Sequence, residues 1–245
     1  MRLTIVGSGD AFGSGGRFNT CFHVAVPGAS FLVDCGASSL IALKRAGIDR
    51  NAIGLIVVTH FHGDHFGGIP YFMLDAQFFS KRTQPLIIAG PEGLAEWYER
   101  VMEATFPGSS GARRKFDLEL REIRPGEPAR FGAVEVLAAR VRHGQPEGPF
   151  HAYRISAVGR TLAYTGDSEW TDALIGIGQA ADLLIAEAYF YDKKVPLHLD
   201  LATLEEKLPQ IAPKRLLLTH MNDDMLGRIG TLGHEAAEDG MVIDL

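Results

Sequence analysis

The sequence has few of the features that would place a protein outside the cell or across a membrane. Only two of its 245 residues are cysteine, Cys21 and Cys35, which is too few for a disulfide framework. No apolar run approaches the roughly 20 residues that a helix needs to cross a bilayer. The apolar stretch at the N-terminus is too short for a signal peptide. We therefore expect two buried free thiols in a soluble cytoplasmic protein that has no membrane partner.

Basic charge is also scarce. The chain has 24 lysine and arginine residues against 30 aspartate and glutamate residues, for a formal net charge of -6. This balance argues against a protein built mainly to grip nucleic acid. There is no linker rich in proline and serine, and a hydrophobic content of 46% is enough for a substantial core. We expect one domain over residues 1–245.

A glycine-rich loop, Gly7–Gly16, follows the first apolar run. It is no dinucleotide fingerprint, because Phe12 stands where the third glycine should be and no helical pattern follows. It is no P-loop either, because no Gly-Lys-Ser/Thr sequence closes it. Two interpretations stay open: a flexible connection, or a loop at the rim of a site where Arg17 and Asn19 contact substrate.

The most informative stretch is the hexapeptide from His60 to His65, which holds three histidines and one aspartate. Imidazole and carboxylate are the groups that borderline divalent metals prefer. The apolar run Leu55–Val58 precedes the hexapeptide, so His60 and His62 leave a strand end on the same side. A turn at Gly63 can then bring Asp64 and His65 back toward them. The spacing indicates a metal site that can hold two ions.

Apolar runs elsewhere in the chain end in the same way. Arg215–Leu218 is followed by Thr219 and His220, and Thr161–Tyr164 is followed by Thr165, Gly166 and Asp167. In layered α/β folds, sites lie outside the carboxyl ends of strands. Patterning predicts further strands at residues 2–6, 21–26, 30–33, 85–89, 118–123, 131–139, 153–158, 183–186 and 241–244, and helices at 38–46, 69–79, 91–106 and 201–208. The candidate ligands are expected to converge on one edge, and the aromatic residues of 69–79 are expected in the core.

The hexapeptide, which reads His-x-His-x-Asp-His, resembles the signature of the metallo-β-lactamase fold superfamily. The resemblance implies an α/β fold, a four-layer αββα sandwich, and further ligands that this chain supplies in order. By the resemblance, one metal ion is held by His60, His62 and His143, and a second by Asp64, His65 and His220, with Asp167 bridging them. The implied cofactors are two divalent ions, Zn²⁺ first, with Mn²⁺ and Fe²⁺ as alternatives.

The segment from Glu187 to His198 resembles the Glu/His pair of ribonuclease Z and related phosphodiesterases. The resemblance implies that a metal-bridging hydroxide attacks phosphorus, with Asp64, His198 and Glu187 as the catalytic residues. In those enzymes the histidine contacts the scissile phosphate, and the glutamate orients the histidine. The chain departs from that branch at Asp200, where a serine or threonine is usual, and the acidic group there is expected to alter substrate affinity.

We expect a phosphodiesterase that acts on a small phosphodiester or nucleotide. Ribonuclease Z enzymes have a long protruding arm that holds RNA, and residues 106–130 are too short for one, so nucleic acid is not the favoured partner. Three alternatives remain: a lactone, carboxyl-ester or thioester hydrolase, a ribonuclease Z-like RNA endonuclease, and a non-catalytic metal-binding sensor. A homodimer is compatible with the sequence.

Overall fold

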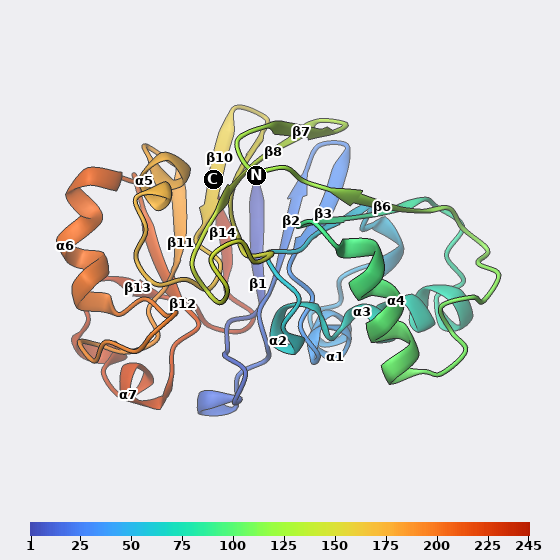
Figure 1. The fold of residues 1–245 in the computed structure, drawn as a ribbon, viewed down its shortest axis with the longest axis horizontal. Coiled ribbons are helices and arrows are strands. Elements are labelled where there is room, and N and C mark those ends of the chain that lie inside the picture. Colours follow the sequence, from blue (N-terminus) through green and yellow to red (C-terminus); the bar gives the residue numbers. More distant parts are fainter.

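Two seven-stranded β-sheets form the centre of the computed structural model, which describes residues 1–245 (Figure 1). The first sheet has, in spatial order, β14 (Val242–Asp244), β1 (Arg2–Gly7), β2 (Cys21–Val26), β3 (Ala29–Val33), β4 (Leu55–Val57), β5 (Leu86–Gly90) and β6 (Leu118–Glu122). The second has β13 (Glu235–Ala236), β12 (Leu216–Thr219), β11 (Leu183–Glu187), β10 (Arg160–Tyr164), β9 (His151–Ala157), β8 (Val134–Arg140) and β7 (Pro128–Phe131).

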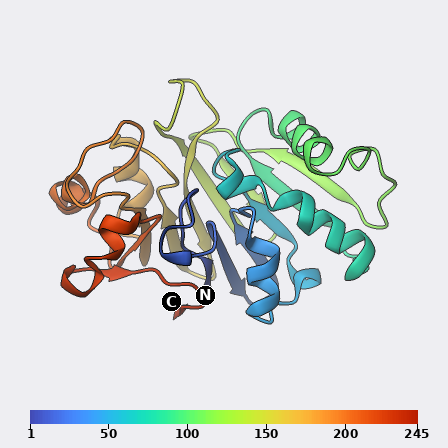
Figure 2. The ribbon, with the colours of Figure 1, turned by 90° about the horizontal axis from the view of Figure 1, so that it is seen from below.

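Helices cover the outer face of each sheet, which gives the expected four layers (Figures 1 and 2). Beside the first sheet are α1 (Ser39–Arg45), α2 (Gly63–Phe66), α3 (Ile69–Leu74), the π-helical segment η3 (Asp75–Phe79) and α4 (Leu94–Thr105). Beside the second sheet are α5 (Ala173–Gly178), α6 (Leu201–Ile211) and α7 (Asp223–Leu226). Short 3₁₀ turns are η1 (Ser14–Gly16), η2 (Arg50–Ala52) and η4 (Ile229–Thr231). None of the helices is long and apolar enough to cross a membrane.

Strand β4 shows why the sheets are buried on both faces. Leu55 and Val57 belong to the core between the two sheets, whereas Ile56 and Val58 belong to the core under the helices of the first sheet. A continuous apolar run therefore fills two layers at once, as is typical of sheets covered on both sides. The two sheets meet in contacts such as the edge-to-face pair of Phe22 and Tyr164, whose ring centroids are 5.1 Å apart.

The topology brings the ends of several strands to one edge of the sandwich. Strands β3 to β6 are parallel, as are β10 to β13. Strand β8 also runs the same way as β10, because each is antiparallel to β9. The residues that follow these strands lie at their carboxyl ends, where the sequence predicts the site.

Some predicted elements differ from the structure. Residues 131–139 form not one strand but the last residue of β7 and most of β8, because a turn at Gly132 with φ of 61° separates the two strands. The helix predicted at 69–79 begins as α3 and continues from Asp75 as the π-helical η3. The prediction that its aromatic residues are core is correct for Phe72 and wrong for Tyr71, Phe78 and Phe79, which are exposed. Helices α5 and α7 were not predicted, because each is shorter than two turns.

The two thiols are where the sequence places them, since Cys21 and Cys35 are free and fully buried. Arg82 is an unexpected member of the interior, with only 1% of its surface exposed. Its guanidinium donates hydrogen bonds to main-chain oxygens of Gln84, Arg50, Ile53 and Pro85 at 2.6–3.1 Å. Four carbonyl acceptors thus offset the desolvation of a buried cation.

Candidate metal centre

The predicted ligands lie together at the carboxyl edge of the sheets. His60 follows β4 and is 1% exposed, and the chain then turns into the single-turn helix α2, on which Asp64 and His65 are buried. His62 is the residue before that helix and is exposed. The expected tight bend is thus a helical turn, whose first residue is Gly63.

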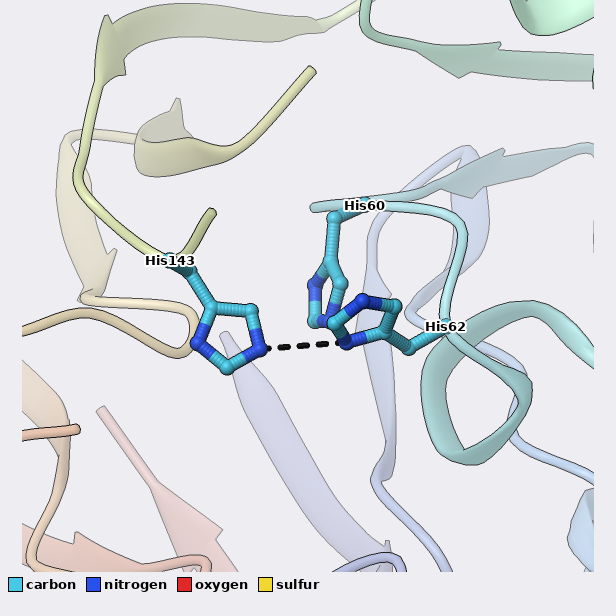
Figure 3. Close-up of side chains that lie close together, drawn as sticks. All are labelled: His60, His62 and His143. Atoms are coloured by element: carbon cyan, nitrogen blue, oxygen red, sulfur yellow. Dashed lines mark hydrogen bonds between the residues drawn. The ribbon is translucent and has the colours of Figure 1, made fainter. Parts of the chain in front are cut away.

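One group of ligand atoms consists of His60, His62 and His143, which contribute one nitrogen each, all within 4.8 Å of one another. Figure 3 shows the three rings facing a common space, His143 from the loop after β8 and the other two from the loop after β4. The Nε2 atom of His143 is 3.1 Å from Nδ1 of His62. Nε2 of His60 is buried without any hydrogen-bond partner.

Hydrogen bonds fix which nitrogen each ring presents. Nδ1–H of His143 donates to the carbonyl oxygen of Leu197 at 2.8 Å. Nδ1 of His60 lies 3.1 Å from the hydroxyl of Thr59, which itself donates to Asp34 and so accepts from the ring. Both rings therefore direct an unprotonated Nε2 into the group, which is the tautomer that binds a metal. Burial, followed by the charge of His65, holds the pKa of His60 well below its usual value.

A second group consists of Asp64, His65, Asp167 and His220. Nε2 of His65 lies 3.3 Å from Oδ2 of Asp64 and 3.3 Å from Oδ2 of Asp167. Nε2 of His220 lies 3.2 Å from the same two oxygens. On the other side of its ring, His65 donates from Nδ1 to Asp34 at 2.7 Å. The second group therefore also has oriented rings and two carboxylates.

Asp167 lies between the two groups. Its Oδ2 is 3.7 Å from Nε2 of His143 in the first group, and its Oδ1 is buried without a partner. Gly166, with φ of 60°, precedes it, and a Cβ there would meet the carbonyl oxygen of His151 at 2.7 Å. A glycine is thus needed to bring this carboxylate into place.

Carboxylates surround the histidines of the second group with negative charge. Burial alone lowers the pKa of a histidine, but the carboxylates of Asp167, Asp64 and Glu187 outweigh it and raise the pKa of His220 to about 10. The same balance raises the pKa of His65 well above its usual value. Buried lone pairs that attract protons this strongly attract a divalent cation for the same reason. With the unpartnered atoms of His60 and Asp167, these residues fit a divalent metal site.

Glu187 and His198 form the pair that the sequence predicts. Nδ1–H of His198 donates to Oε1 of Glu187 at 2.5 Å, and Glu187 is fully buried at the end of β11. Oε2 of Glu187 accepts from the main-chain N–H groups of Ser168 at 2.9 Å and Leu199 at 3.2 Å. Burial lowers the pKa of His198, but the bond to Glu187 outweighs it and raises that pKa.

Glu187, His198, Asp167 and His220 also form a third group of close ligand atoms. The oxygens of Glu187 are already paired with N–H donors. We therefore read Glu187 as the residue that orients His198 rather than as a metal ligand.

The site opens into a pocket of 260 Å³. Its lining includes five residues of the first two groups together with His198, and also Ala11, Phe12, Tyr189, Pro196 and Leu197. The ring of Tyr189 stacks on that of His198 with centroids 4.6 Å apart. The glycine-rich loop is thus a rim of the site, and Figure 2 shows its segment, in dark blue, between the two helical layers.

Three polar side chains near the site form hydrogen bonds within the protein itself. Arg17 donates to Ser8 and to the carbonyl oxygen of Ala237, and Asn19 bonds the main chain of Asp10 and Ser38, so both side chains fasten the loop. Asp200 caps helix α6 by accepting from the N–H of Thr203 at 2.8 Å. A carboxylate two residues after His198 is a helix cap here.

Asp34, Thr59 and Tyr189 were not predicted as part of the site. Asp34 accepts from Thr59 and His65 and so connects the two groups of ligands. Its sequence signal was its position at the end of β3, at the same edge as the other ligands. Tyr189 gives no signal in the sequence, because its stacking on His198 depends on the path of residues 188–198.

Comparison with known proteins agrees with this geometry. The model of the family described as "Anti-Pycsar protein Apyc1" matches residues 1–237. A ribonuclease Z of Methanothermobacter thermautotrophicus is 27% identical and aligns over 91% of this chain and 87% of its own length.

Solved structures are similar over the whole chain. Human tRNase Z, short form, has a TM-score of 0.80 and 26% identity, and the match covers 100% of this chain and 99% of that one. The metallo-β-lactamase fold protein YhfI of Bacillus subtilis has a TM-score of 0.77 at 21% identity and 99% coverage of both. The predicted fold and the predicted ribonuclease Z/phosphodiesterase branch of the superfamily are thereby confirmed. The chain is a metal-dependent hydrolase of the metallo-β-lactamase fold.

Proposed function

This chain belongs to the family of the anti-Pycsar protein Apyc1, and we propose that it hydrolyses phosphodiester bonds with two divalent metal ions. The observation that supports this most is the bond between Glu187 and His198 beside the ligand groups. A protonated imidazole aimed at the pocket suits a phosphoryl oxygen or an alkoxide leaving group. Hydrolysis of a carboxylic ester at the same metals has little need for such an imidazole.

We assign the same residues as metal ligands that the sequence predicts. One ion would be held by His60, His62 and His143, the other by Asp64, His65 and His220, and Asp167 would contact both. Metal ions bound there would polarise the phosphoryl group and lower the pKa of a water molecule. Zn²⁺ matches this histidine and carboxylate set, and Mn²⁺ and Fe²⁺ accept the same donors.

The chain's own residues would position the reaction. Nδ1–H of His198 is committed to Glu187, so Nε2 is the nitrogen left to donate to a phosphoryl oxygen or to the leaving oxygen. Stacking on Tyr189 keeps that ring in one orientation. Asp64, whose Oδ2 is fixed between His65 and His220, would also orient the attacking water.

The curated relatives make RNA the better supported substrate. From the sequence alone we expect a small phosphodiester ahead of a ribonuclease Z-like endonuclease, whereas the curated relatives and the human neighbour support the endonuclease. A small phosphodiester stays as the other candidate for two reasons. The segment between α4 and β7 contains only the strand β6, with no protruding arm, and the matching family model is that of an anti-Pycsar protein and not of a ribonuclease.

Metal-loaded protein should therefore be tested on two substrates, a transfer RNA with a 3′ extension and bis(p-nitrophenyl) phosphate. Cleavage of the RNA at one position, lost in His198→Ala, would support the endonuclease. Cleavage of the small diester without any RNA product would favour the small substrate. Turnover of neither, in protein that contains its metal, would contradict the proposal and favour a metal-binding sensor. Cytoplasmic location and a homodimer remain predictions.

A further inference from the structure

Phe12 is the most exposed large apolar side chain of the protein, with 81% of its surface accessible. Two other exposed aromatic side chains have partners: Lys44 lies over Phe79 at 4.4 Å, and Trp97 stacks on Phe61. Phe78 is exposed without such a partner, but it lines a pocket other than that of the ligand groups. No ring or cation packs on Phe12. Phe12 also differs from these side chains in position, because it lines the pocket that contains the ligand groups.

The loop that holds Phe12 is fixed in place. The carboxylate of Asp10 is fully buried and accepts from the N–H of Phe12 at 3.1 Å, the N–H of Ser14 at 3.0 Å and the hydroxyl of Ser14 at 2.7 Å. From the other side, the N–H of Gly15 donates to Asp223 of α7 at 3.0 Å. A bare phenyl ring is thus presented at the pocket by a preorganised loop, which lowers the entropic cost of binding to it.

The shape of the pocket indicates what would contact this ring. A volume of 260 Å³ suits the phosphoryl group and its immediate substituents. A larger substituent, such as a nucleoside, would extend out of the pocket, and Phe12 is the lining residue whose ring is 81% exposed to solvent. Aromatic side chains stack on every nucleobase, because each base has a π-face.

We propose that Phe12 is a specificity-determining residue that stacks on the base of a nucleotide substrate whose phosphodiester lies in the metal pocket. This inference rests on the proposed phosphodiesterase activity. It applies equally to RNA and to small nucleotide substrates. Phe12 would act in binding the base and not as a metal ligand.

Two chromogenic diesters with the same leaving group test the inference. Thymidine 5′-(p-nitrophenyl phosphate) has a base and methyl p-nitrophenyl phosphate has none, and water converts each to its monoester and p-nitrophenol. For Phe12→Ala we expect KM for the thymidine substrate to rise about 5- to 150-fold, with kcat nearly unchanged. KM for the methyl substrate should stay the same.

Control variants separate stacking from other causes. Phe12→Trp should keep the low KM, and Phe12→Leu should raise KM nearly as far as Phe12→Ala does. Phe79→Ala removes a ring that is 72% exposed and lies away from the pocket, and it should leave KM unchanged. Equal effects of Phe12→Ala on both substrates, or no effect on either, would overturn the role of Phe12 while leaving the phosphodiesterase intact. Failure of the wild-type protein to cleave either diester or RNA would instead contradict the proposed function.

Discussion

Asp34 donates no hydrogen bond but accepts from both parts of the site: from Nδ1–H of His65 at 2.7 Å and from the hydroxyl of Thr59 at 2.8 Å, which in turn contacts His60. Asp34 is fully buried and has a left-handed backbone with φ of 60°. Such a conformation costs free energy outside glycine. The position of this carboxylate is therefore maintained at the expense of local strain.

Replacement of that carboxylate tests its role in orienting the ligands. Asp34→Asn keeps the size of the side chain but removes the charge that favours Nε2 of His65 as the free nitrogen. We expect metal affinity to fall about 10- to 100-fold, measured by competition with a chelator. The exposed Asp244→Asn is the matched control. Unchanged affinity in Asp34→Asn would mean that Asp34 serves only the fold.

The number of bound ions tests the assignment of ligands. Of the two groups assigned as metal sites, His143 belongs only to the first and His220 only to the second. His143→Ala and His220→Ala should each reduce the metal content toward one ion per chain, and Asp167→Ala should weaken both sites. Elemental analysis of purified protein gives the count, with the surface His234→Ala as control. A full complement of metal in either histidine variant would refute the assignment.

The rate and its pH dependence test the pair of Glu187 and His198. His198→Ala should lower kcat for a phosphodiester about 10²- to 10⁴-fold without loss of metal. Because Glu187 raises the pKa of His198, the protonated imidazole persists to higher pH in the wild type. In Glu187→Gln the decline of kcat with rising pH should therefore begin at a lower pH. Superimposable pH profiles would contradict a proton on His198.

Arg82 tests an account of stability that does not involve the metals. Arg82→Met removes a buried guanidinium and leaves four main-chain oxygens without their donor. We expect a loss of about 3 kcal/mol or more in the free energy of unfolding, measured by urea denaturation. The exposed Arg130→Met should change it by less than about 0.5 kcal/mol. A similar small change in Arg82→Met would show that water satisfies those oxygens.

His151 should make stability depend on pH. Burial, followed by the charge of Arg140, lowers the pKa of His151 from 6.5 to about 4 in the folded protein. Below pH 6.5 the unfolded chain binds the proton first, so the folded state loses stability as pH falls from 6.5 to 4, by about 3 kcal/mol in total. Plots of the free energy of unfolding against pH should differ in slope between wild type and His151→Gln over that pH range alone. Parallel curves would contradict a neutral buried ring.

Much of the site was predictable because its residues follow strands in a fixed chemical pattern. The hexapeptide, Asp167 and His220 each come directly after an apolar run, and parallel strands bring such positions to one edge. His143 and His198 have no such local signal and were placed by resemblance alone. The pairing of His198 with Glu187 depends on a loop whose path no short pattern specifies.

The sequence does not reveal how polar side chains in loops are bonded, nor which way the residues of η3 face. Arg17, Asn19 and Asp200 have side chains able to contact a substrate, but each satisfies main-chain groups nearby. Local hydrogen bonds of this kind depend on loop geometry, which composition does not reveal. Phe78 and Phe79 were expected in the core by hydrophobicity, whereas the π-helical turn η3 rotates them outward.

The most direct test is turnover of bis(p-nitrophenyl) phosphate beside p-nitrophenyl acetate, with the metal content measured on the same sample. The account predicts cleavage of the phosphodiester that requires bound metal, is removed by chelator, and falls steeply in His198→Ala. Cleavage of the acetate alone, at a rate indifferent to His198→Ala, would contradict it and identify a carboxyl-ester hydrolase.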